Sequence, residues 1–371
     1  MARPIVIGVE ASALSSQRTG IGNYLANMLV ALPAVAGPVQ IRLFSNSPID
    51  TAGLGDVTTT IARPHGQRGF VWQNTQLAAA LLADPPDLFW GASGLLPLVR
   101  PRRTPTVVTI HDLVYRLAGG TLPRANRVSR RLLQPASARS ATRVVAVSQA
   151  TADDVAHYYG RCVDAVIHPV VNDAYRPVGA DEIARVRAAH ALPDRYLLTL
   201  GTLEPRKNLG SLVAAALLLR QRGIAAPPLI VAGGRGWLDD DLTATIAEGE
   251  ATGVVRRLGF VPDRDMPGLY AGAAYFILAS IYEGFGMPVV EAQLCGTHVL
   301  ASDIPSLREA SGGAAAFFDP TSTGIADCLA RVLDGTFAVP RPTIDPGDND
   351  PQRAAGRLWA VMESCLTDRR G

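Results

Sequence analysis

The fold follows from one stretch of the chain, Ser280-Ile-Tyr-Glu-Gly-Phe-Gly-Met-Pro-Val-Val-Glu291. The apolar run before it, Ala274–Ala279, is typical of a buried parallel strand. Gly284 and Gly286 let the backbone turn tightly and approach a ligand, and Pro288 suits the first position of a helix, where its missing N–H is not needed. The stretch therefore predicts a strand, a glycine loop and a helix start.

This corner carries two carboxylates, Glu283 in the loop and Glu291 in the expected first turn of the helix. Free amides at a helix start attract a phosphate, whereas carboxylates beside them repel it unless they point elsewhere. Carboxylates also accept hydrogen bonds from hydroxyl groups, such as those of a sugar or a ribose. The combination favours a sugar nucleotide as the ligand.

Length and composition set the broad class of protein. The chain has 371 residues, of which 48% are hydrophobic, and this is more than one ordinary core holds, so we expect two domains. No apolar run approaches membrane-spanning length, and the N-terminus leads directly into a strand without a signal peptide, so we expect a cytoplasmic protein. Residues 1–173 carry a net charge of +6 and the remainder −4, which indicates either an anionic partner for the first half or an arginine-rich codon usage.

Strand-like and helix-like segments alternate along the chain, as in parallel sheets covered by helices. Functional side chains in such sheets gather at the carboxyl ends of the strands. The first strand, Ile5–Glu10, precedes a turn with Gly20 and Gly22 that either cradles a phosphate or only turns tightly. A later strand ends at His111, which is either functional or held by one structural hydrogen bond, and at Asp112, which orients it or caps the turn.

A basic segment follows this strand. Arg127, Arg130 and Arg131 share one face of its predicted helix. A basic amphipathic helix binds an anionic membrane or a lipid diphosphate, and the same pattern also describes a solvated surface. Peripheral contact with a membrane is therefore one of two interpretations of this helix.

The pattern of alternating segments breaks around residues 168–177, where two prolines and several turn residues occur. We place the domain boundary there. The first domain is expected over residues 1–172 and the second over residues 173–350, followed by a last helix within 351–371.

The second domain restarts with a strand that leads into the loop Gly201-Thr-Leu-Glu-Pro-Arg-Lys-Asn208. Arg206 and Lys207 in this loop suit a diphosphate, because arginine grips two oxygens and lysine adds a point charge. Lys207 is the only lysine of the chain, which favours a functional cation over an ordinary surface residue.

Two further strand ends carry candidate residues. Gly233 permits close approach of the backbone to a ligand. Phe260 and Val261 either present backbone groups to a nucleobase or form a plain turn. Because parallel strands bring their carboxyl ends to one edge of the sheet, we expect these loops to converge on one ligand.

Four motifs together resemble the family 4 retaining glycosyltransferases with the GT-B fold, an α/β architecture of two Rossmann-like domains whose parallel sheets face each other across a cleft. The spacing of the two glutamates matches that family's signature, and the resemblance covers nearly the whole chain. The motifs are Thr19–Tyr24, His111-Asp112, Gly201–Asn208 and Glu283–Glu291, and Ser302–Glu309 resembles the segment that follows them.

The resemblance implies a role for each matched residue. Arg206 and Lys207 would bind the donor diphosphate, while Glu283 would hold the transferred sugar and Glu291 the ribose. The last helix would cross back onto the first domain. The implied catalytic residues are His111, Arg206, Lys207 and Glu283; the donor-binding residues are Gly20, Gly22, Gly233, Phe260, Val261, Gly284, Phe285, Gly286, Met287 and Glu291; and the acceptor-binding residues are Asp112 and Tyr24.

The sequence and the resemblance together define an expected reaction. We expect a retaining hexosyltransferase that moves a mannosyl group from GDP-mannose to a glycan or a polyprenyl-diphosphate-linked saccharide of a bacterial surface polysaccharide. UDP-sugar donors and a non-catalytic sugar-nucleotide-binding protein are the alternatives; a nicotinamide-dependent oxidoreductase is disfavoured because the glycine turn lacks its third glycine. Neither a metal nor a cofactor is expected, because the two cations stabilise the leaving group, and no nucleic acid partner is expected.

Overall fold

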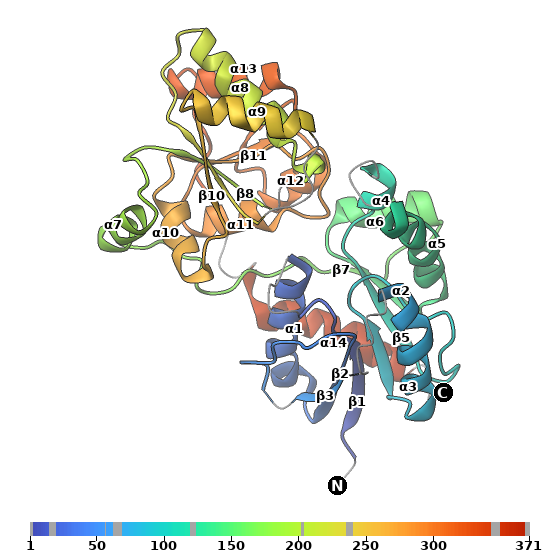
Figure 1. Cartoon of the computed structure of the whole chain (residues 1–371). Helices are drawn as coiled ribbons and strands as arrows, with labels where there is room; N and C mark the ends of the chain where they lie inside the picture. Colours follow the sequence, from blue (N-terminus) through green and yellow to red (C-terminus); the bar gives the residue numbers. More distant parts are fainter. Residues whose placement is uncertain are drawn as a thin grey trace. The chain divides into compact units, whose positions relative to one another are not determined.

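The computed structural model describes residues 3–14, 20–55, 57–61, 69–118, 124–201, 204–234, 240–342 and 349–367. The chain forms two compact units, one made of residues 1–171 with 349–371 and the other of residues 172–348 (Figure 1). The boundary that the sequence predicts after residue 172 lies beside this division. Each unit is described by itself below.

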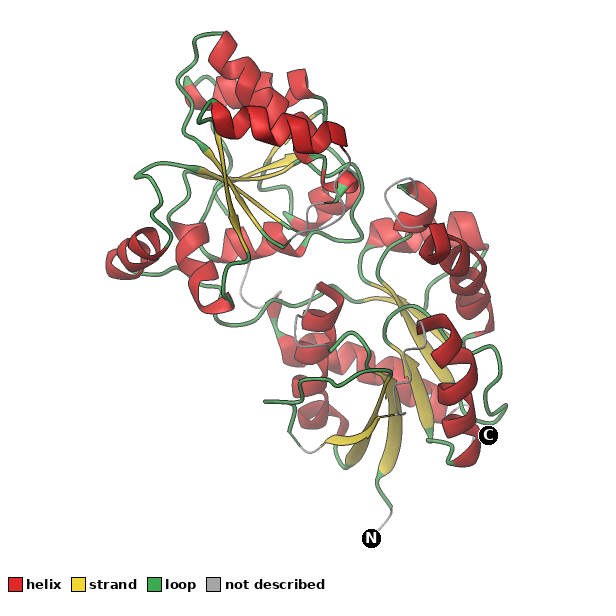
Figure 2. Cartoon of the chain, viewed as in Figure 1, coloured by secondary structure: helices red, strands yellow, loops and turns green. Residues whose placement is uncertain are grey.

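The first unit is built on a parallel sheet, which within the described residues has the strand order β3-β2-β1-β4-β5-β6-β7 (Figure 2). The order reverses between β1 and β4, and ligands of open α/β sheets bind beside such a switch point. The central strands are apolar along their length because helices cover both faces. The strands are β1 Ile5–Glu10, β2 Val39–Ser45, β3 Val57–Ile61, β4 Leu88–Gly91, β5 Thr106–Ile110, β6 Arg143–Ala146 and β7 Ala165–Val166.

Helices of the first unit other than α14 lie between consecutive strands, and in α6 both ends follow local signals in the sequence. Ser148 caps α6 by accepting the N–H of Thr151, and Gly160 ends that helix in the left-handed conformation. The helices are α1 Gly20–Ala36, α2 Gly69–Trp72, the π-helix Gln73–Leu77, α3 Ala78–Ala83, α4 Val114–Leu117, α5 Arg124–Ser140, α6 Gln149–Tyr159 and α14 Pro351–Thr367.

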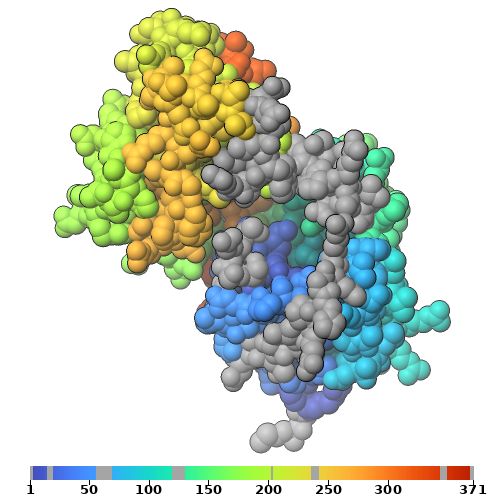
Figure 3. Space-filling model, viewed as in Figure 1, coloured from blue at the N-terminus to red at the C-terminus, as the bar shows by residue number. Residues whose placement is uncertain are grey.

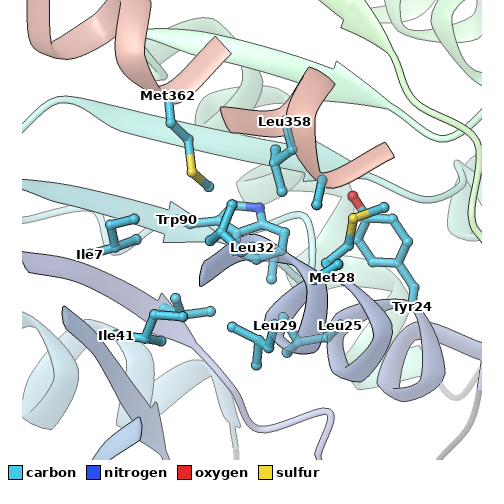
Figure 4. Packing of buried hydrophobic residues seen from close by; sticks show 14 of the residues in the cluster. Ile7, Tyr24, Leu25, Met28, Leu29, Leu32, Ile41, Trp90, Leu358 and Met362 are labelled. Atoms are coloured by element: carbon cyan, nitrogen blue, oxygen red, sulfur yellow. The ribbon is translucent and has the colours of Figure 1, made fainter. Parts of the chain in front are cut away.

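The last helix, α14, completes the core of the first unit. Leu358 and Met362 are fully buried and belong to the same apolar cluster as Met28 of α1 and Trp90 of β4. Figure 4 shows these side chains converging from α1, α14 and the sheet. The return of the chain to its first domain, which the resemblance implies, is therefore present in the structure.

The second unit repeats the plan of the first. Its parallel sheet has the order β10-β9-β8-β11-β12-β13 among the described residues, so its order reverses between β8 and β11. Both units are thus Rossmann-like, which confirms the predicted fold class. The strands are β8 Leu197–Leu200, β9 Leu229–Ala232, β10 Val255–Gly259, β11 Tyr275–Leu278, β12 Val299–Ser302 and β13 Ala316–Phe318.

Helices cover both faces of the second sheet (Figure 1). One apolar cluster, which includes Leu212, Ile246 and Leu329, joins α8, α9 and α13 to one face of the sheet. The helices are α7 Ala180–Ala189, the 3₁₀ turn Pro205–Lys207, α8 Leu209–Gln221, α9 Asp240–Ala251, the 3₁₀ turn Asp263–Asp265, α10 Met266–Ala271, α11 Met287–Leu294, α12 Pro305–Ala310 and α13 Ser322–Leu333.

Candidate active site

Two neighbouring strands of the second unit bring the predicted cations and Glu283 together. Arg206 and Lys207 lie in the 3₁₀ turn after β8, and Glu283 lies in the loop after β11. Arg206 Nη1 is 2.7 Å from Glu283 Oε2, and Lys207 Nζ is 2.5 Å from Glu283 Oε1. The N–H of Ile281 also donates to the carbonyl oxygen of Arg206 at 2.9 Å, so the two loops are joined through their backbones. This cluster lies at the switch point of the sheet.

Glu283 is buried, and its charge depends on these neighbours. Burial raises the pKa of a carboxyl group, but here the charges of Arg206 and Lys207, with hydrogen bonds from Lys207 and from Ser280 Oγ at 2.7 Å, outweigh burial and lower the pKa of Glu283 to about 2. Glu283 is therefore ionised throughout the neutral range, and it is unsuited to donating a proton.

Both cations are oriented before any ligand arrives. Arg206 Nε donates to Glu204 Oε2 at 2.8 Å, so this guanidinium is held between two carboxylates. The side chains of Arg206 and Lys207 are 20% and 14% exposed. The sequence predicts only that they face a diphosphate; it gives no sign that Glu283 neutralises them in the unliganded protein.

Glycines at the ends of β8 and β9 allow the supporting loops to touch. Gly233 has φ +133°, and a Cβ there would lie 2.1 Å from the carbonyl oxygen of Gly201. Gly201 has φ +145°, and a Cβ there would meet Lys207 Cε at 3.2 Å. Only glycine fits this contact. Gly233 thus supports the loop that carries Lys207, and its predicted close approach to a ligand stays a prediction.

Glu291 of the same unit is buried like Glu283 but has different neighbours. It is 6% exposed, and its Oε2 accepts the hydroxyl of Tyr270 at 2.7 Å. Burial raises the pKa of Glu291 to about 7, with a smaller raising effect from Asp263, against the hydrogen bond from Tyr270 and the charge of Lys207. The surroundings therefore lower the pKa of Glu283 and raise the pKa of Glu291.

The glycine loop differs in one respect from the sequence prediction. Helix α11 begins at Met287 after Gly286, which has φ +116°, so Pro288 is the second helical residue and Glu291 lies in the second turn. The expected first-turn position of Glu291 is wrong, because the left-handed Gly286 places the helix start earlier than Pro288 alone suggests. Gly284 and Phe285 of this loop are buried.

Phe260 and Val261, at the end of β10, differ sharply in exposure. The Phe260 side chain is 71% exposed, whereas Val261 is 5% exposed. Val261 anchors the loop in the unit, and Phe260 presents its ring to solvent. An exposed aromatic ring at a strand's carboxyl end offers a stacking surface to a nucleobase.

His111 of the first unit is held by its backbone surroundings. Its Nε2 lies 2.7 Å from the carbonyl oxygen of Ala92, which can only accept, so Nε2 carries the hydrogen and Nδ1 is the acceptor. Burial lowers the pKa of His111, against the bond to Ala92 and the charge of Asp112, so the ring is neutral. Tyr24 is 1% exposed and packs edge-on against this ring at 5.0 Å, where it supports His111.

The other first-unit candidates have mainly local roles in this structure. Asp112 Oδ1 accepts the N–H of Val114 at 3.1 Å and so caps the turn that opens α4, the second of the two roles predicted for it. Gly20 and Gly22 lie in the first turn of α1, and Thr19 of the same motif lies outside the described residues.

Sequence reasoning missed Glu10, the last residue of β1. It is 4% exposed, its Oε1 accepts the N–H of Ser12 at 3.0 Å, and its Oε2 accepts the hydroxyl of Ser93. The only sequence signal is a carboxylate that ends an otherwise apolar strand.

Two searches of the described ranges concern other classes of site. No three His, Cys, Asp or Glu side chains in them are gathered closely enough to hold a metal ion. No helix within these ranges has both the length and the apolar character needed to cross a membrane.

The geometry can be compared with known proteins. Residues 18–175 match the family described as Glycosyltransferase Family 4, and residues 181–336 match the one described as Glycosyl transferases group 1. A similar relative is the O-antigen chain mannosyltransferase B of Escherichia coli, which is 46% identical over 125 residues, or 34% of this chain and 33% of that protein. This chain therefore aligns with about a third of that relative's length.

Solved structures share the fold at low sequence identity. Sucrose-phosphate synthase of Thermosynechococcus elongatus has a TM-score of 0.70 and 18% identity, covering 99% of this chain and 97% of that one. HepE of Anabaena, solved in complex with UDP and glucose, has a TM-score of 0.65 and 18% identity, covering 99% and 98%. Since both halves of the chain match glycosyltransferase families and the whole chain folds as these enzymes do, it belongs to the family 4 glycosyltransferases with the GT-B fold.

Proposed function

We propose that this chain is a retaining hexosyltransferase that moves a mannosyl group from GDP-mannose to a saccharide acceptor, free or linked to a polyprenyl diphosphate, in the synthesis of a bacterial surface polysaccharide. The observation that carries the proposal is the cluster of Arg206, Lys207 and Glu283 at the switch point of the second sheet. The named activity of the Escherichia coli relative favours mannose as the transferred sugar.

The cluster accounts for departure of the leaving group. Breaking the bond between the anomeric carbon and the phosphate oxygen leaves a nucleoside diphosphate with one more negative charge. Arg206 and Lys207 stabilise that charge, so no metal ion is required at this step. Because these cations are already oriented, the protein needs little rearrangement to stabilise the charge that forms during the reaction.

Retention of configuration fits the ionised state of Glu283. In the proposed step the acceptor oxygen bonds to the anomeric carbon on the face that the phosphate leaves, and the departing phosphate oxygen takes the acceptor's proton. Glu283, whose pKa is about 2, acts as an acceptor for a sugar hydroxyl and as the holder of both cations. Oε1 of Glu283 already accepts hydrogen bonds from Lys207 and Ser280, whereas Oε2, which accepts one from Arg206, has room for a second.

The identity of the nucleotide is tested by thermal shift. GDP is expected to raise the melting temperature of the protein more than UDP at equal concentration, because binding to the native state alone stabilises it. UDP-glucose is the main alternative, since HepE was solved with UDP and glucose. Stabilisation by UDP alone would overturn the GDP-mannose assignment, and stabilisation by neither nucleotide would count against the donor site itself.

The pKa of Glu291 predicts a pH dependence of nucleotide binding. The ionised carboxylate accepts two ribose hydroxyls, whereas the protonated form accepts them poorly, so affinity rises as pH increases through about 7. We expect about tenfold weaker binding at pH 5.5 than at pH 8.5 by calorimetry. Glu291→Gln should remove this dependence apart from the titration of the nucleotide itself.

Tyr270→Phe is the matched control for that assignment. The hydroxyl of Tyr270 lowers the pKa of Glu291, so its loss should move the midpoint of the binding curve to higher pH. An unchanged midpoint in Tyr270→Phe, or the same pH dependence in Glu291→Gln, would show that another group is titrating.

We also propose that the first unit contacts an anionic membrane through α5 and the loop before β5. Leu132 of α5 is 69% exposed, and Leu98 and Val99 of the loop are 58% and 60% exposed. Arg100 Nη2 donates to the carbonyl oxygen of Ser140 at 2.8 Å, which ties the loop to the end of α5. Figure 3 shows light blue and teal atoms of α2, α3 and the following loop on the face of the first unit that is in view.

The positive charge of these two segments is complementary to an anionic surface. Residues 92–105 and 124–140 contain eight arginines and no acidic residue. Arg130 and Arg131 are placed by the structure, whereas the side chain of Arg127 lies outside the described residues. Arginines near a bilayer and inserted aliphatic side chains both favour association with anionic lipid.

Vesicle sedimentation tests the membrane contact. Binding is expected to require anionic lipid and to weaken with salt, because the attraction is screened. Leu98→Asp combined with Leu132→Asp should lower the bound fraction at least about fivefold, whereas Val30→Asp, which changes an exposed residue of α1, should not. Equal binding to neutral vesicles, or equal loss in both variants, would contradict the assignment.

A further inference from the structure

Glu10 is a carboxylate buried at the end of β1. Among the described residues it makes two hydrogen bonds, from the N–H of Ser12 and the hydroxyl of Ser93, and no ion pair with it occurs there. Two of the other three buried carboxylates in the described part of the chain form ion pairs. Glu283 pairs with Arg206 and Lys207, and Asp265 lies 2.7 Å from Arg185. Glu291, held by Tyr270, is the exception.

An unpaired buried charge is expensive for folding. Burying a carboxylate costs several kcal/mol unless charges or hydrogen bonds compensate it. Glutamine, the neutral side chain of the same shape, could keep both contacts by accepting the N–H of Ser12 through its oxygen and donating an amide N–H to the Ser93 hydroxyl oxygen. A buried carboxyl group with only two hydrogen-bond partners among the described residues is a candidate for ligand binding.

The surroundings of Glu10 contain a second group that lacks a partner. The hydroxyl oxygen of Ser12 is buried and has no hydrogen-bond partner in the structure. Buried hydroxyls almost always have one, so this group is available to a ligand. A carboxylate and an unpaired hydroxyl two residues apart can together bind neighbouring hydroxyl groups of a sugar.

The position in the fold is that of a binding site. Glu10 ends β1, and Ser93 follows β4, the two strands between which the order of the first sheet reverses. The residue before Ser93 is Ala92, whose carbonyl oxygen accepts the hydrogen bond from His111 Nε2. Glu10 and His111 are therefore linked through the same two-residue segment.

We propose that Glu10, with Ser12 and Ser93, forms a site in the first unit that binds hydroxyl groups of the saccharide acceptor. Each oxygen of the Glu10 carboxylate accepts one protein hydrogen bond and has capacity for one from the acceptor. The Ser12 hydroxyl supplies a donor beside them. This inference rests on the proposed transfer to a saccharide, and it adds the residues that select the acceptor.

Kinetics with a defined acceptor test the site. The wild-type protein and Glu10→Gln are assayed with GDP-mannose and octyl α-D-mannopyranoside, each varied in turn. We expect the KM for the acceptor to rise about tenfold in Glu10→Gln, while the KM for GDP-mannose stays within about twofold. The melting temperature should stay close to that of the wild type, because glutamine can keep a hydrogen bond to Ser12 and to Ser93.

Deoxy acceptors distinguish hydroxyl binding from an indirect structural effect. The four monodeoxy octyl mannosides, lacking the hydroxyl at C2, C3, C4 or C6, are compared in both proteins. For the one whose missing hydroxyl faces Glu10, the difference between wild type and Glu10→Gln should shrink to less than about twofold. An effect of equal size on all acceptors would overturn the proposal.

Asp265→Asn is the control for loss of a buried carboxylate. Asp265 of the second unit is 3% exposed and is paired with Arg185 and His190, so its substitution should lower the melting temperature and leave the acceptor KM unchanged. A lower melting temperature with an unchanged acceptor KM in Glu10→Gln would assign Glu10 to loop structure alone. A wild-type protein that transfers no sugar from GDP-mannose or UDP-glucose would instead refute the proposed function.

Discussion

Lys207→Ala is expected to lower kcat for sugar transfer roughly 10²–10³-fold, the usual effect of removing one preoriented group that stabilises developing charge. Lys207 Nζ lies 2.5 Å from Glu283 at the edge where we propose that the donor diphosphate binds, and Arg206 alone would then carry the charge of the leaving group. Initial rates at saturating donor and acceptor measure this loss. Nucleotide affinity should fall much less than kcat if the charge of Lys207 acts mainly in the transition state.

Arg222→Ala provides the comparison for this variant. Arg222 pairs with Asp327 on the surface of the same unit, so its loss removes one positive charge without touching the cluster, and kcat should remain within about twofold. Circular dichroism should show both variants folded, since Arg206 still pairs with Glu283 in Lys207→Ala. Equal activity in the two variants would remove Lys207 from the catalytic machinery.

Gly233→Ala is expected to destabilise the second unit by at least about 1–3 kcal/mol, because it places a side chain at a strained backbone position. The added Cβ would lie 2.1 Å from the carbonyl oxygen of Gly201, and φ at Gly233 is +133°. The loop that carries Arg206 and Lys207 must shift to relieve this contact, so nucleotide affinity should also fall more than about tenfold. Urea unfolding and calorimetry measure the two effects.

The neighbouring residue supplies the control for this substitution. A Cβ at Gly234 meets no atom within 4 Å, so Gly234→Ala should be stable and bind nucleotide as the wild type does. Similar behaviour of the two alanine variants would mean that the contact between Gly201 and Gly233 does not position the cations.

The sequence predicts the convergence of these loops but not their pairing. Apolar runs and glycine turns identify the strand ends, and parallel strands place those ends on one edge. Which strands are neighbours depends on packing across the whole sheet, and β8 lies beside β11 although 74 residues of the chain separate Leu200 from Tyr275. The ion pairs of Glu283 with Arg206 and Lys207 follow from that adjacency, so local sequence could not reveal them.

Two further differences have local physical causes. The sequence places Glu291 one residue too near the start of the helix, because the start of α11 at Met287 is set by the left-handed backbone of Gly286, which composition does not specify. Glu10 escapes sequence reasoning because a carboxylate at the end of a strand usually faces solvent; its 4% exposure depends on the loops that follow β1 and β4.

The return of α14 also determines the order in which the molecule can be completed. All residues of the second unit, 172–348, precede Leu358 and Met362 on the ribosome, and the first unit cannot close its core around Met28 without them. Most chains finish their domains from the N-terminus onward. Here the unit begun first is finished last, so a newly made chain holds an open apolar face until its final turns of helix emerge.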